Sequence, residues 1–323
     1  YTPVDAEYLM AYREAKDGQL LQEGISEAGS MASWLAAATA WSTHGEMLVP
    51  FYFYYSMFGF QRVGDQIWQA ADMNARGFLL GCTAGRTTLQ GEGLQHQDGH
   101  SLLIAACNPG VVAYEPTYAY EVGLLVRRGL ERMAAGENVI YYLTLQNQPY
   151  VMPPIPEGVD EGIERGVYLL RAAIEVQGAE LQRTSPPVQL LGSGCITLDV
   201  LQAQETLVRE HGVAADVWVV TSYSELRREA IEFDTRNRRE RRVDADVLVP
   251  YVVEMLGETE GPIVACSDWM RAWPDMVAPW LPGRLTSLGT DGFGLSDTRE
   301  NLRRHFEIDA RAVVEAVLWK LGR

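Results

Sequence analysis

The chain has 323 residues, of which 47% are hydrophobic and 22% are charged, a composition typical of globular proteins and enough for two domains. Its formal net charge of −16 opposes binding to phosphate backbones and anionic lipid surfaces, so we expect neither nucleic acid nor membrane as a partner. The four cysteines are widely spaced and no apolar run approaches the roughly 20 residues of a membrane helix, so we expect a cytoplasmic protein with reduced thiols.

In the first half of the chain, short apolar stretches rich in β-forming residues alternate with longer amphipathic ones. Residues 31–42 are rich in alanine and follow Gly29 and Ser30, which favours a helix start there. Residues 120–136 repeat apolar positions at helical spacing and end in glycine, as expected of a helix. This alternation predicts βαβ units and a parallel sheet covered on both faces. The predicted strands are residues 48–53, 78–82, 110–114 and 138–145.

Two proline-rich breaks interrupt the chain after residue 150. They bracket what we predict to be a connecting helix, and we place the domain boundary near residue 186. We therefore expect an α/β protein with two doubly wound domains, residues 1–150 and 187–323, joined by residues 151–186. The second domain is predicted to contain the strands VQLLGSG, ADVWVVTS, PIVACSD and RLTSLG and a closing helix in ARAVVEAVLWKLG.

Several common functional signatures are absent from the sequence. It contains no G-x-x-x-x-G-K-[ST], G-x-S-x-G or H-E-x-x-H pattern, and no cysteine and histidine spacing typical of a metal site. His96 and His100 are four residues apart, but the glycines and polar residues around them argue for a loop rather than a helix. We therefore predict no metal ligands in this chain.

Three segments carry residue types suited to chemistry. Glu27 follows the apolar Ile25 just before a predicted helix, where the helix dipole favours an acid; the alternative is an ordinary acid of the first helical turn. Seven aromatic residues lie within residues 51–60, either as core or at the carboxyl edge of the sheet, where open α/β sheets bind ligands. Residues 83–100 form a long loop rich in glycine and threonine, in which His96 is the candidate general acid or base.

Together these segments resemble the thiamine diphosphate enzymes of the transketolase and pyruvate dehydrogenase superfamily, and most closely the homodimeric pyruvate dehydrogenases of bacteria. The resemblance implies three α/β domains, of which the chain holds most of the middle, pyrimidine-binding domain and all of the transketolase C-terminal-like domain. We expect the opening of the middle domain, and the G-D-G…N pattern that binds Mg²⁺ and diphosphate, to lie outside it. The matching strings, in order, are QEGISE, FYFYYSMFGFQR, GRTTLQGEGLQHQDGHS, YEPTYAYEV, VQLLGSG and LGTDGFGLSDTRENLRRHFEIDA.

The resemblance implies a role for five residues. Glu27 matches the catalytic glutamate that hydrogen-bonds the cofactor's pyrimidine ring, and Ile25 would line the cofactor cleft and, with the aromatic residues, give the glutamate apolar surroundings. Phe58 matches the aromatic residue that stacks on the aminopyrimidine, and Tyr55 a hydroxyl that faces the substrate. His96 matches the histidine that handles the substrate carboxylate or the acyl intermediate and favours transfer to lipoamide.

The activity implied is that of an oxidoreductase: oxidative decarboxylation of pyruvate, with acetyl transfer to the lipoyl group of the dihydrolipoyl acetyltransferase component. Thiamine diphosphate and Mg²⁺ are the implied cofactors, and a second subunit of a homodimer is the implied partner. Alternatives are the same chemistry on another 2-oxo acid, a transketolase-like two-carbon transfer, and a half-enzyme that serves assembly.

Some residues of these segments receive no role from the resemblance. Arg86, Asp98 and His100 share the loop of His96 without an assigned function. The C-terminal domain supplies no catalytic candidate. Its segment LGTDGFGLSDTREN is predicted to be a strand–loop–helix junction that packs against a partner subunit.

Overall fold

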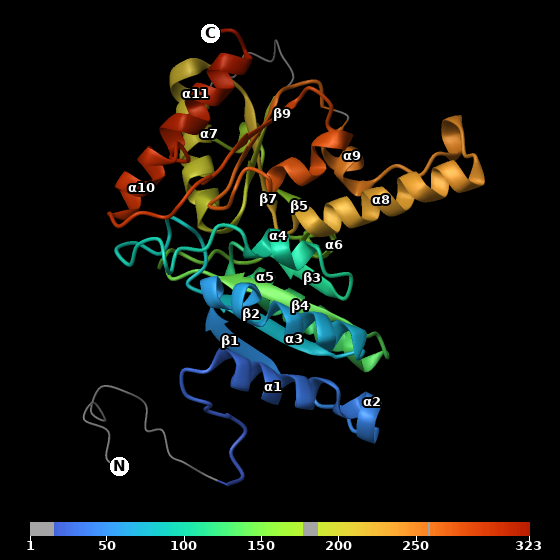
Figure 1. Cartoon of the computed structure of the whole chain (residues 1–323). Helices are drawn as coiled ribbons and strands as arrows, with labels where there is room; N and C mark the ends of the chain where they lie inside the picture. Colours follow the sequence, from blue (N-terminus) through green and yellow to red (C-terminus); the bar gives the residue numbers. More distant parts are fainter. Residues whose placement is uncertain (1–15, 177–186, 258) are drawn as a thin grey trace.

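The computed structural model describes residues 16–176, 187–257 and 259–323, which are organised around two β-sheets (Figure 1). The first sheet has the strand order β1-β2-β4-β3, and all its strands are parallel. The second has the order β5-β7-β6-β8-β9, with only β5 antiparallel to its neighbour. In Figure 1 the first sheet, blue to green, lies below the second, which runs from yellow-green to red. Two α/β domains with largely parallel sheets were predicted, and both are confirmed.

The four strands predicted for the first sheet are present. Its central strands β2 and β4 are buried along nearly their whole length, as expected of parallel strands covered on both faces. The edge strand β1 buries Tyr54 but exposes Phe51, Phe53 and Tyr55, which share its other face. The strand bounds are β1 Phe51–Tyr55, β2 Gly77–Cys82, β3 Val111–Tyr114 and β4 Ile140–Leu145.

Helices cover both faces of the first sheet. α1, α3 and α4 pack on one face through residues such as Trp34, Ile67 and Leu102, and α5 packs on the other through Leu124 and Leu125. The predicted helix at residues 31–42 begins earlier than expected, because the Ser26 hydroxyl caps α1 by accepting the Gly29 N–H at 3.2 Å. The bounds are α1 Glu27–Ala38, α2 Ala40–His44, α3 Phe60–Asp72, α4 Ser101–Ala106 and α5 Ala119–Ala134.

The second sheet contains the four strands predicted for it, and the closing helix is also confirmed. α7 and α11 pack against one face of this sheet, whereas α8, α9 and the 3-10 segment η5 contribute to a core shared with the first sheet. The strands are β5 Val167–Arg171, β6 Val188–Gly192, β7 Ala215–Val220, β8 Ile263–Cys266 and β9 Leu285–Leu288. The helices are α7 Thr197–His211, α8 Tyr223–Glu240, α9 Tyr251–Leu256, η5 Pro274–Trp280, α10 Arg299–His305 and α11 Ala310–Lys320.

The segment predicted to be a connecting helix has a different structure. Its described part contains the short helix α6, Asp160–Arg165, followed directly by β5, which pairs with β7 as an antiparallel edge strand of the second sheet. The strand forms because Val167 and Tyr168 are buried in different core clusters, one on each face. Residues 177–186, where the predicted segment ends, lie outside the described residues.

The carboxyl ends of the strands of the two sheets face each other. Glu115, directly after β3, donates its N–H to the carbonyl of Thr221, directly after β7, at 2.7 Å. Gln146, directly after β4, accepts the N–H of Cys195, which follows β6, at 2.9 Å. The loops that leave both sheets therefore meet in one polar layer, where side chains from distant parts of the chain are brought together.

Glu115 in this layer makes the stability of the fold depend on pH. Its side chain is fully buried, and burial raises the pKa of Glu115 to about 8, against the opposing effect of the nearby Ser193 hydroxyl. The folded chain thus keeps a proton that the unfolded chain releases, so the free energy of unfolding falls as pH rises through the window between the ordinary glutamate pKa and 8. We expect the Glu115 carboxyl to lower the free energy of unfolding by about 2 kcal/mol between pH 6 and pH 8.

The measurement is urea unfolding at several pH values, with Glu115→Gln as the variant. The glutamine resembles the protonated carboxyl, so its unfolding free energy should decline less with pH than that of the parent. Glu315→Gln, which alters an exposed acid of α11, is the control and should keep the parent's slope. Equal slopes for the parent and Glu115→Gln would contradict the assignment.

Candidate active site

Glu27 lies at the first position of α1, next to strand β1. Its Oε1 accepts a hydrogen bond from Nη1 of Arg62 at 2.8 Å, and its backbone carbonyl lies 3.4 Å from the Tyr52 hydroxyl. The position at a helix start agrees with the sequence, and the helix dipole favours the negative charge there. The apolar surroundings expected from Ile25 are not found, because Ile25 is fully exposed and the neighbour of the carboxylate is a guanidinium.

Three further predicted residues form a single aromatic group. Tyr55 ends β1, and Phe58 ends the 3-10 turn η1, Ser56–Phe58, that follows it. The ring centroid of His96 lies 5.4 Å from that of Tyr55 and 5.1 Å from that of Phe58, with both pairs edge to face. The ring centroids of Tyr55 and Phe58 lie 5.9 Å apart. The structure therefore brings together side chains that are about 40 residues apart in the sequence.

Arg62 connects Glu27 to the aromatic group, and it was not among the residues predicted from the sequence. Its guanidinium lies 4.0 Å from the centroid of the Phe58 ring, a cation–π contact, while Nη1 binds the Glu27 carboxylate. About half of the Arg62 side chain is exposed, so it can leave this position without opening the core. Its place four residues after Phe58, at helical spacing, was the signal available in the sequence.

His96 belongs to the loop of residues 83–100 that joins β2 to α4, called the His96 loop from here on. Its Nδ1 atom is buried and has no hydrogen-bond partner among the described residues; the Oε2 atom of Glu92 lies 3.6 Å away. About a quarter of the side chain is exposed. The imidazole therefore keeps hydrogen-bonding capacity for a ligand, which suits a proton-transfer or anion-binding role.

Asp98 joins the His96 loop to the turn that carries Phe58. It is fully buried, and its Oδ1 accepts the backbone N–H groups of His100 and Ser101 at 3.0 Å each, at the start of α4. Its Oδ2 accepts the hydroxyls of Ser56 and Ser101. His100 lies in the same region, with its Nε2 atom 2.9 Å from the amide nitrogen of Gln61. These contacts give Asp98 a structural part in holding the two loops together.

The C-terminal domain also contacts the His96 loop. The segment LGTDGFGLSDTREN forms the predicted strand–loop–helix junction, from β9 to α10. The guanidinium of Arg86 donates to the carbonyls of Thr290 and Gly292 in this junction, and the Leu295 N–H donates to Gln97 at 2.8 Å. The junction therefore packs against the His96 loop of its own chain; its packing against a partner subunit stays a prediction.

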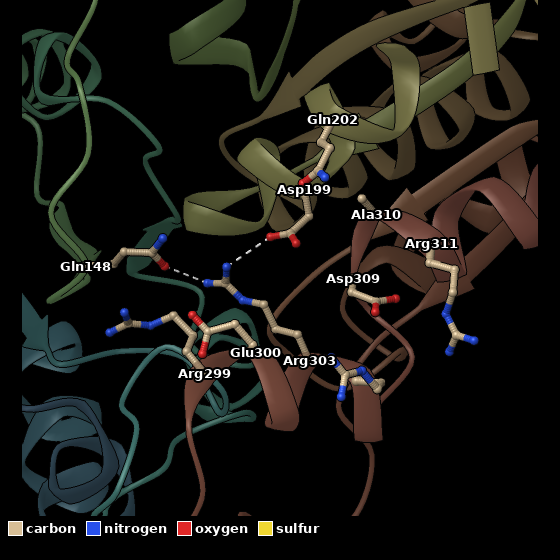
Figure 2. Close-up of a pocket in the computed structure, with 10 residues that line it drawn as sticks. Gln148, Asp199, Gln202, Arg299, Glu300, Arg303, Asp309, Ala310 and Arg311 are labelled. Carbon is tan, nitrogen blue, oxygen red and sulfur yellow. Dashed lines mark hydrogen bonds and ion pairs between the residues drawn. The ribbon is translucent and has the colours of Figure 1, made fainter. Parts of the chain in front are cut away.

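A cavity of about 320 Å³ lies beside this junction, between α7, α10 and Gln148 (Figure 2). The buried Arg303 crosses it, donating to Asp199 at 3.0 Å and to Gln148 at 2.6 Å. Burial raises the pKa of Asp199 to about 6, with Arg303 opposing the shift. Arg299 donates to the carbonyl of Thr88 at 2.7 Å. None of the predicted site residues lines this cavity, and of its arginines Arg299 and Arg303 contact Thr88 of the His96 loop.

No group of three or more His, Cys, Asp or Glu side chains among the described residues is arranged to hold a metal ion. Among the helices of the same residues, none combines the length and apolar composition needed to cross a membrane.

Two family models match the chain in succession. Residues 1–153 match the pyruvate dehydrogenase E1 component middle domain, and residues 166–309 match the transketolase-like C-terminal domain. Over its whole length the chain is 53% identical to the pyruvate dehydrogenase E1 component of Mycobacterium tuberculosis and 47% identical to that of Escherichia coli K12. It covers 34% and 35% of those two proteins, so it spans about a third of their length.

Solved structures show the same fold at low sequence identity. Transketolase from Leishmania mexicana is 15% identical with a TM-score of 0.64, over 89% of this chain and 36% of that one. A structure described as a split gene transketolase, inactive β4 tetramer, is 20% identical with a TM-score of 0.63. The latter match covers 93% of this chain and 83% of that one.

Proposed function

The chain belongs to the family of pyruvate dehydrogenase E1 components, and we propose that it supplies part of an active site for the oxidative decarboxylation of pyruvate. In this proposal the acetyl group passes to the lipoyl group of the dihydrolipoyl acetyltransferase component. The activity is assigned to the protein that combines these residues with a diphosphate-binding part, called the assembled E1 protein from here on. The observation that carries the proposal is the contact of Tyr55, Phe58 and His96 with one another, together with the link from Phe58 to Glu27 through Arg62.

The residues of the site fit the aminopyrimidine ring of thiamine diphosphate. That ring is planar and carries N–H groups, and a group of the same kind, the guanidinium of Arg62, already lies on the Phe58 face while donating to Glu27. An aromatic face next to a carboxylate is thus able to accept stacking and a hydrogen bond at once. Bound cofactor would supply the nucleophile that attacks the 2-oxo carbon and the electron sink for loss of CO₂. Arg62 must move away from Phe58 for the ring to stack there.

Each residue of the site has a distinct part in the proposal. Glu27 accepts or shares a proton at the pyrimidine nitrogen, Phe58 stacks on the ring, and Ile25, exposed in this chain, lines the cleft. Tyr55 directs its hydroxyl toward the substrate. His96, whose Nδ1 has no hydrogen-bond partner among the described residues, binds the substrate carboxylate or the acyl group and favours its transfer to lipoamide.

The domain assignment and the assembly are also proposals. Residues 1–150 form the pyrimidine-binding domain, residues 151–186 the connection and residues 187–323 the transketolase C-terminal-like domain. A homodimer places the cofactor between the pyrimidine-binding domain of one subunit and the diphosphate-binding domain of the other. Mg²⁺ and the diphosphate are then held by residues outside this chain.

A second candidate is a half-enzyme that is inactive without a partner. The match to the split gene transketolase favours it, because this chain covers 83% of that chain, which is described as an inactive tetramer. A third, decarboxylation of another 2-oxo acid, differs from the main proposal only in the substrate. Comparing pyruvate with 2-oxobutyrate as substrates of the assembled E1 protein separates this third candidate from the main proposal.

The test of the proposal is thiamine diphosphate binding in the presence of Mg²⁺, measured by calorimetric titration. We expect the isolated chain to bind the cofactor weakly, because the roles proposed for its site residues concern the ring and the substrate, and the diphosphate is assigned to residues outside this chain. Adding the diphosphate-binding part should raise the affinity into the micromolar range and restore decarboxylation of pyruvate. Micromolar binding by the isolated chain would contradict this division of the site, and binding without decarboxylation would leave the half-enzyme as the better reading.

A further inference from the structure

We infer that Asp268 is a positioning residue, through which the C-terminal domain holds the His96 loop in place. The inference rests on the proposed function, since it concerns the step assigned to His96. Asp268 follows β8 of the second sheet, whereas the loop follows β2 of the first. It lies 172 residues after His96 in the sequence (268 − 96), and nothing in its local sequence marks it as part of the site.

In the described part of the chain, the Asp268 carboxylate accepts four hydrogen bonds, and all of them come from the His96 loop. Oδ1 accepts the N–H of Thr87 at 2.8 Å and its hydroxyl at 2.7 Å. Oδ2 accepts the N–H of Thr88 at 2.9 Å and its hydroxyl at 2.6 Å. The backbone carbonyl of Asp268 also accepts the N–H of Arg86 at 3.2 Å. Three consecutive residues of the loop are therefore bound to one residue of the other domain.

Because Asp268 is buried, its carboxylate needs these hydrogen bonds to replace those that water would supply. Its side chain is fully buried, as are those of Thr87 and Thr88. Within the described residues no Arg, Lys or His forms an ion pair with Asp268, so the four donors of the loop are its direct partners, with the charges of Arg86 and Arg299 farther away. Gly85 permits the close approach: its φ is +95°, and a Cβ there would collide with the Asp268 carboxylate. A carboxylate that depends on four donors in turn fixes the conformation of the residues that supply them.

Other contacts of the His96 loop show how its bonds to Asp268 limit the position of the His96 side chain. The backbone N–H of His96 bonds only within the loop, to Gly93 at 3.2 Å, and the imidazole touches the first domain through aromatic edges. On the other side of His96, the Met270 N–H donates to the Gly99 carbonyl at 2.9 Å. Residues 86–88 and 99 are thus held by the segment 268–270, which, together with the contacts of Gln97 and Asp98, sets where the loop can place the imidazole.

The test is Asp268→Asn in the assembled E1 protein, with two reactions measured side by side. One is acetyl transfer to lipoamide, the step assigned most strongly to His96; the other is oxidation by an artificial electron acceptor, which needs no lipoyl group. The amide keeps the shape but lacks the charge and turns a donor toward the loop. We expect kcat for acetyl transfer to fall roughly tenfold to a hundredfold, as small misplacements of a catalytic group do, and the other reaction, in which His96 has the smaller part, to fall clearly less.

A second pair of variants covers the case in which Asp268→Asn does not fold. Thr87→Val removes one hydroxyl donor at nearly constant volume and Thr87→Ser keeps it, so the serine should restore acetyl transfer that the valine loses. Hydrogen–deuterium exchange of the loop amides reports the loop directly, and should rise in Asp268→Asn and Thr87→Val only. Asp216→Asn, a matched change at an acid of β7 that binds Ala173 and Gln189 instead, should alter neither readout.

The outcomes separate the inference from the proposed function. Faster loop exchange together with a selective loss of acetyl transfer supports the positioning role. An equal loss of both reactions, or no loss despite faster exchange, would overturn it and leave Asp268 a residue of general stability. An unmodified protein with no activity toward pyruvate by either assay would sink the proposed function, while the exchange data would still decide whether Asp268 holds the loop.

Discussion

Replacing Glu27 with glutamine should slow every reaction of the bound cofactor by about 10²–10³-fold, the effect of removing one preorganised polar contact. Glutamine keeps the size and hydrogen-bonding capacity of the side chain but cannot share a proton with the pyrimidine nitrogen. It also loses the ion pair with Arg62, which is exposed enough to be solvated without large cost. The affected step is activation of the cofactor, so exchange of its C2 proton for deuterium should slow by the same factor.

His96→Ala should fail at a later step than Glu27→Gln. The proposed role of His96 begins only when pyruvate or the acyl group is present, so C2 exchange should stay within a few-fold of the parent. Its loss should appear in decarboxylation and most strongly in acetyl transfer to lipoamide. Quenched-flow NMR of C2 exchange in the assembled E1 protein, together with both activities, measures the difference.

Glu23→Gln serves as the matched control for this comparison. Glu23 lies four residues before Glu27, is exposed and binds the Ser33 hydroxyl rather than Arg62. It should resemble the parent in both readouts. If His96→Ala slows C2 exchange as much as Glu27→Gln does, or if Glu27→Gln leaves exchange unchanged, the division of roles between the two residues is wrong.

Gly59→Ala should lower the free energy of unfolding by about 3 kcal/mol, the upper part of the range for overpacking a core. Gly59 follows the turn that presents Phe58, and the ring of the buried Tyr54 lies directly over it. A Cβ at this position would lie well inside van der Waals contact with that ring, which is itself held between neighbouring core residues. The turn must then shift, so Phe58 should leave its position and cofactor affinity should fall as well.

Gly64→Ala is the matched control for Gly59→Ala. It makes the same change five residues later, within α3, where an added Cβ meets no atom within 4 Å. Alanine is the better helix former, so stability should rise by up to about 1 kcal/mol. Urea unfolding followed by circular dichroism gives both values. Equal stability of Gly59→Ala and the parent would show that the turn tolerates a side chain and that the Tyr54 contact does not fix it.

Most of the fold could be predicted from the sequence because the patterns that indicate strands, helices and breaks are local. Uninterrupted apolar runs predicted the buried parallel strands, and the glycine and proline breaks between them separated the elements. Strand β5 was not predicted because it has only five residues and because buried and exposed residues do not alternate along it. The part of residues 151–186 between the two proline-rich breaks was therefore predicted to be a connecting helix, although β5 in this segment pairs with β7.

The site was predictable only where a family pattern or a short-range spacing existed. Glu27, Tyr55, Phe58 and His96 stand in strings that resemble known enzymes, and the structure places Tyr55, Phe58 and His96 in contact. Arg62 could have been predicted only by knowing that α3 starts at Phe60, which brings a cation four residues after Phe58 back over the Phe58 ring. The contact of Asp268 with Thr87 spans 181 residues, and no local pattern records a pairing at that distance.

That separation has a consequence for synthesis on the ribosome. Thr87 is translated 181 residues before Asp268, which at roughly 5–20 residues per second leaves the loop without its partner for about 10–40 s. The first sheet can assemble within that time, since its strands are complete by residue 145. Its outgoing loop cannot reach its final conformation before β8 has formed. An arrest of translation between residues 145 and 268 should therefore yield nascent chains with a protected first sheet and a protease-sensitive bond between Thr87 and Thr88.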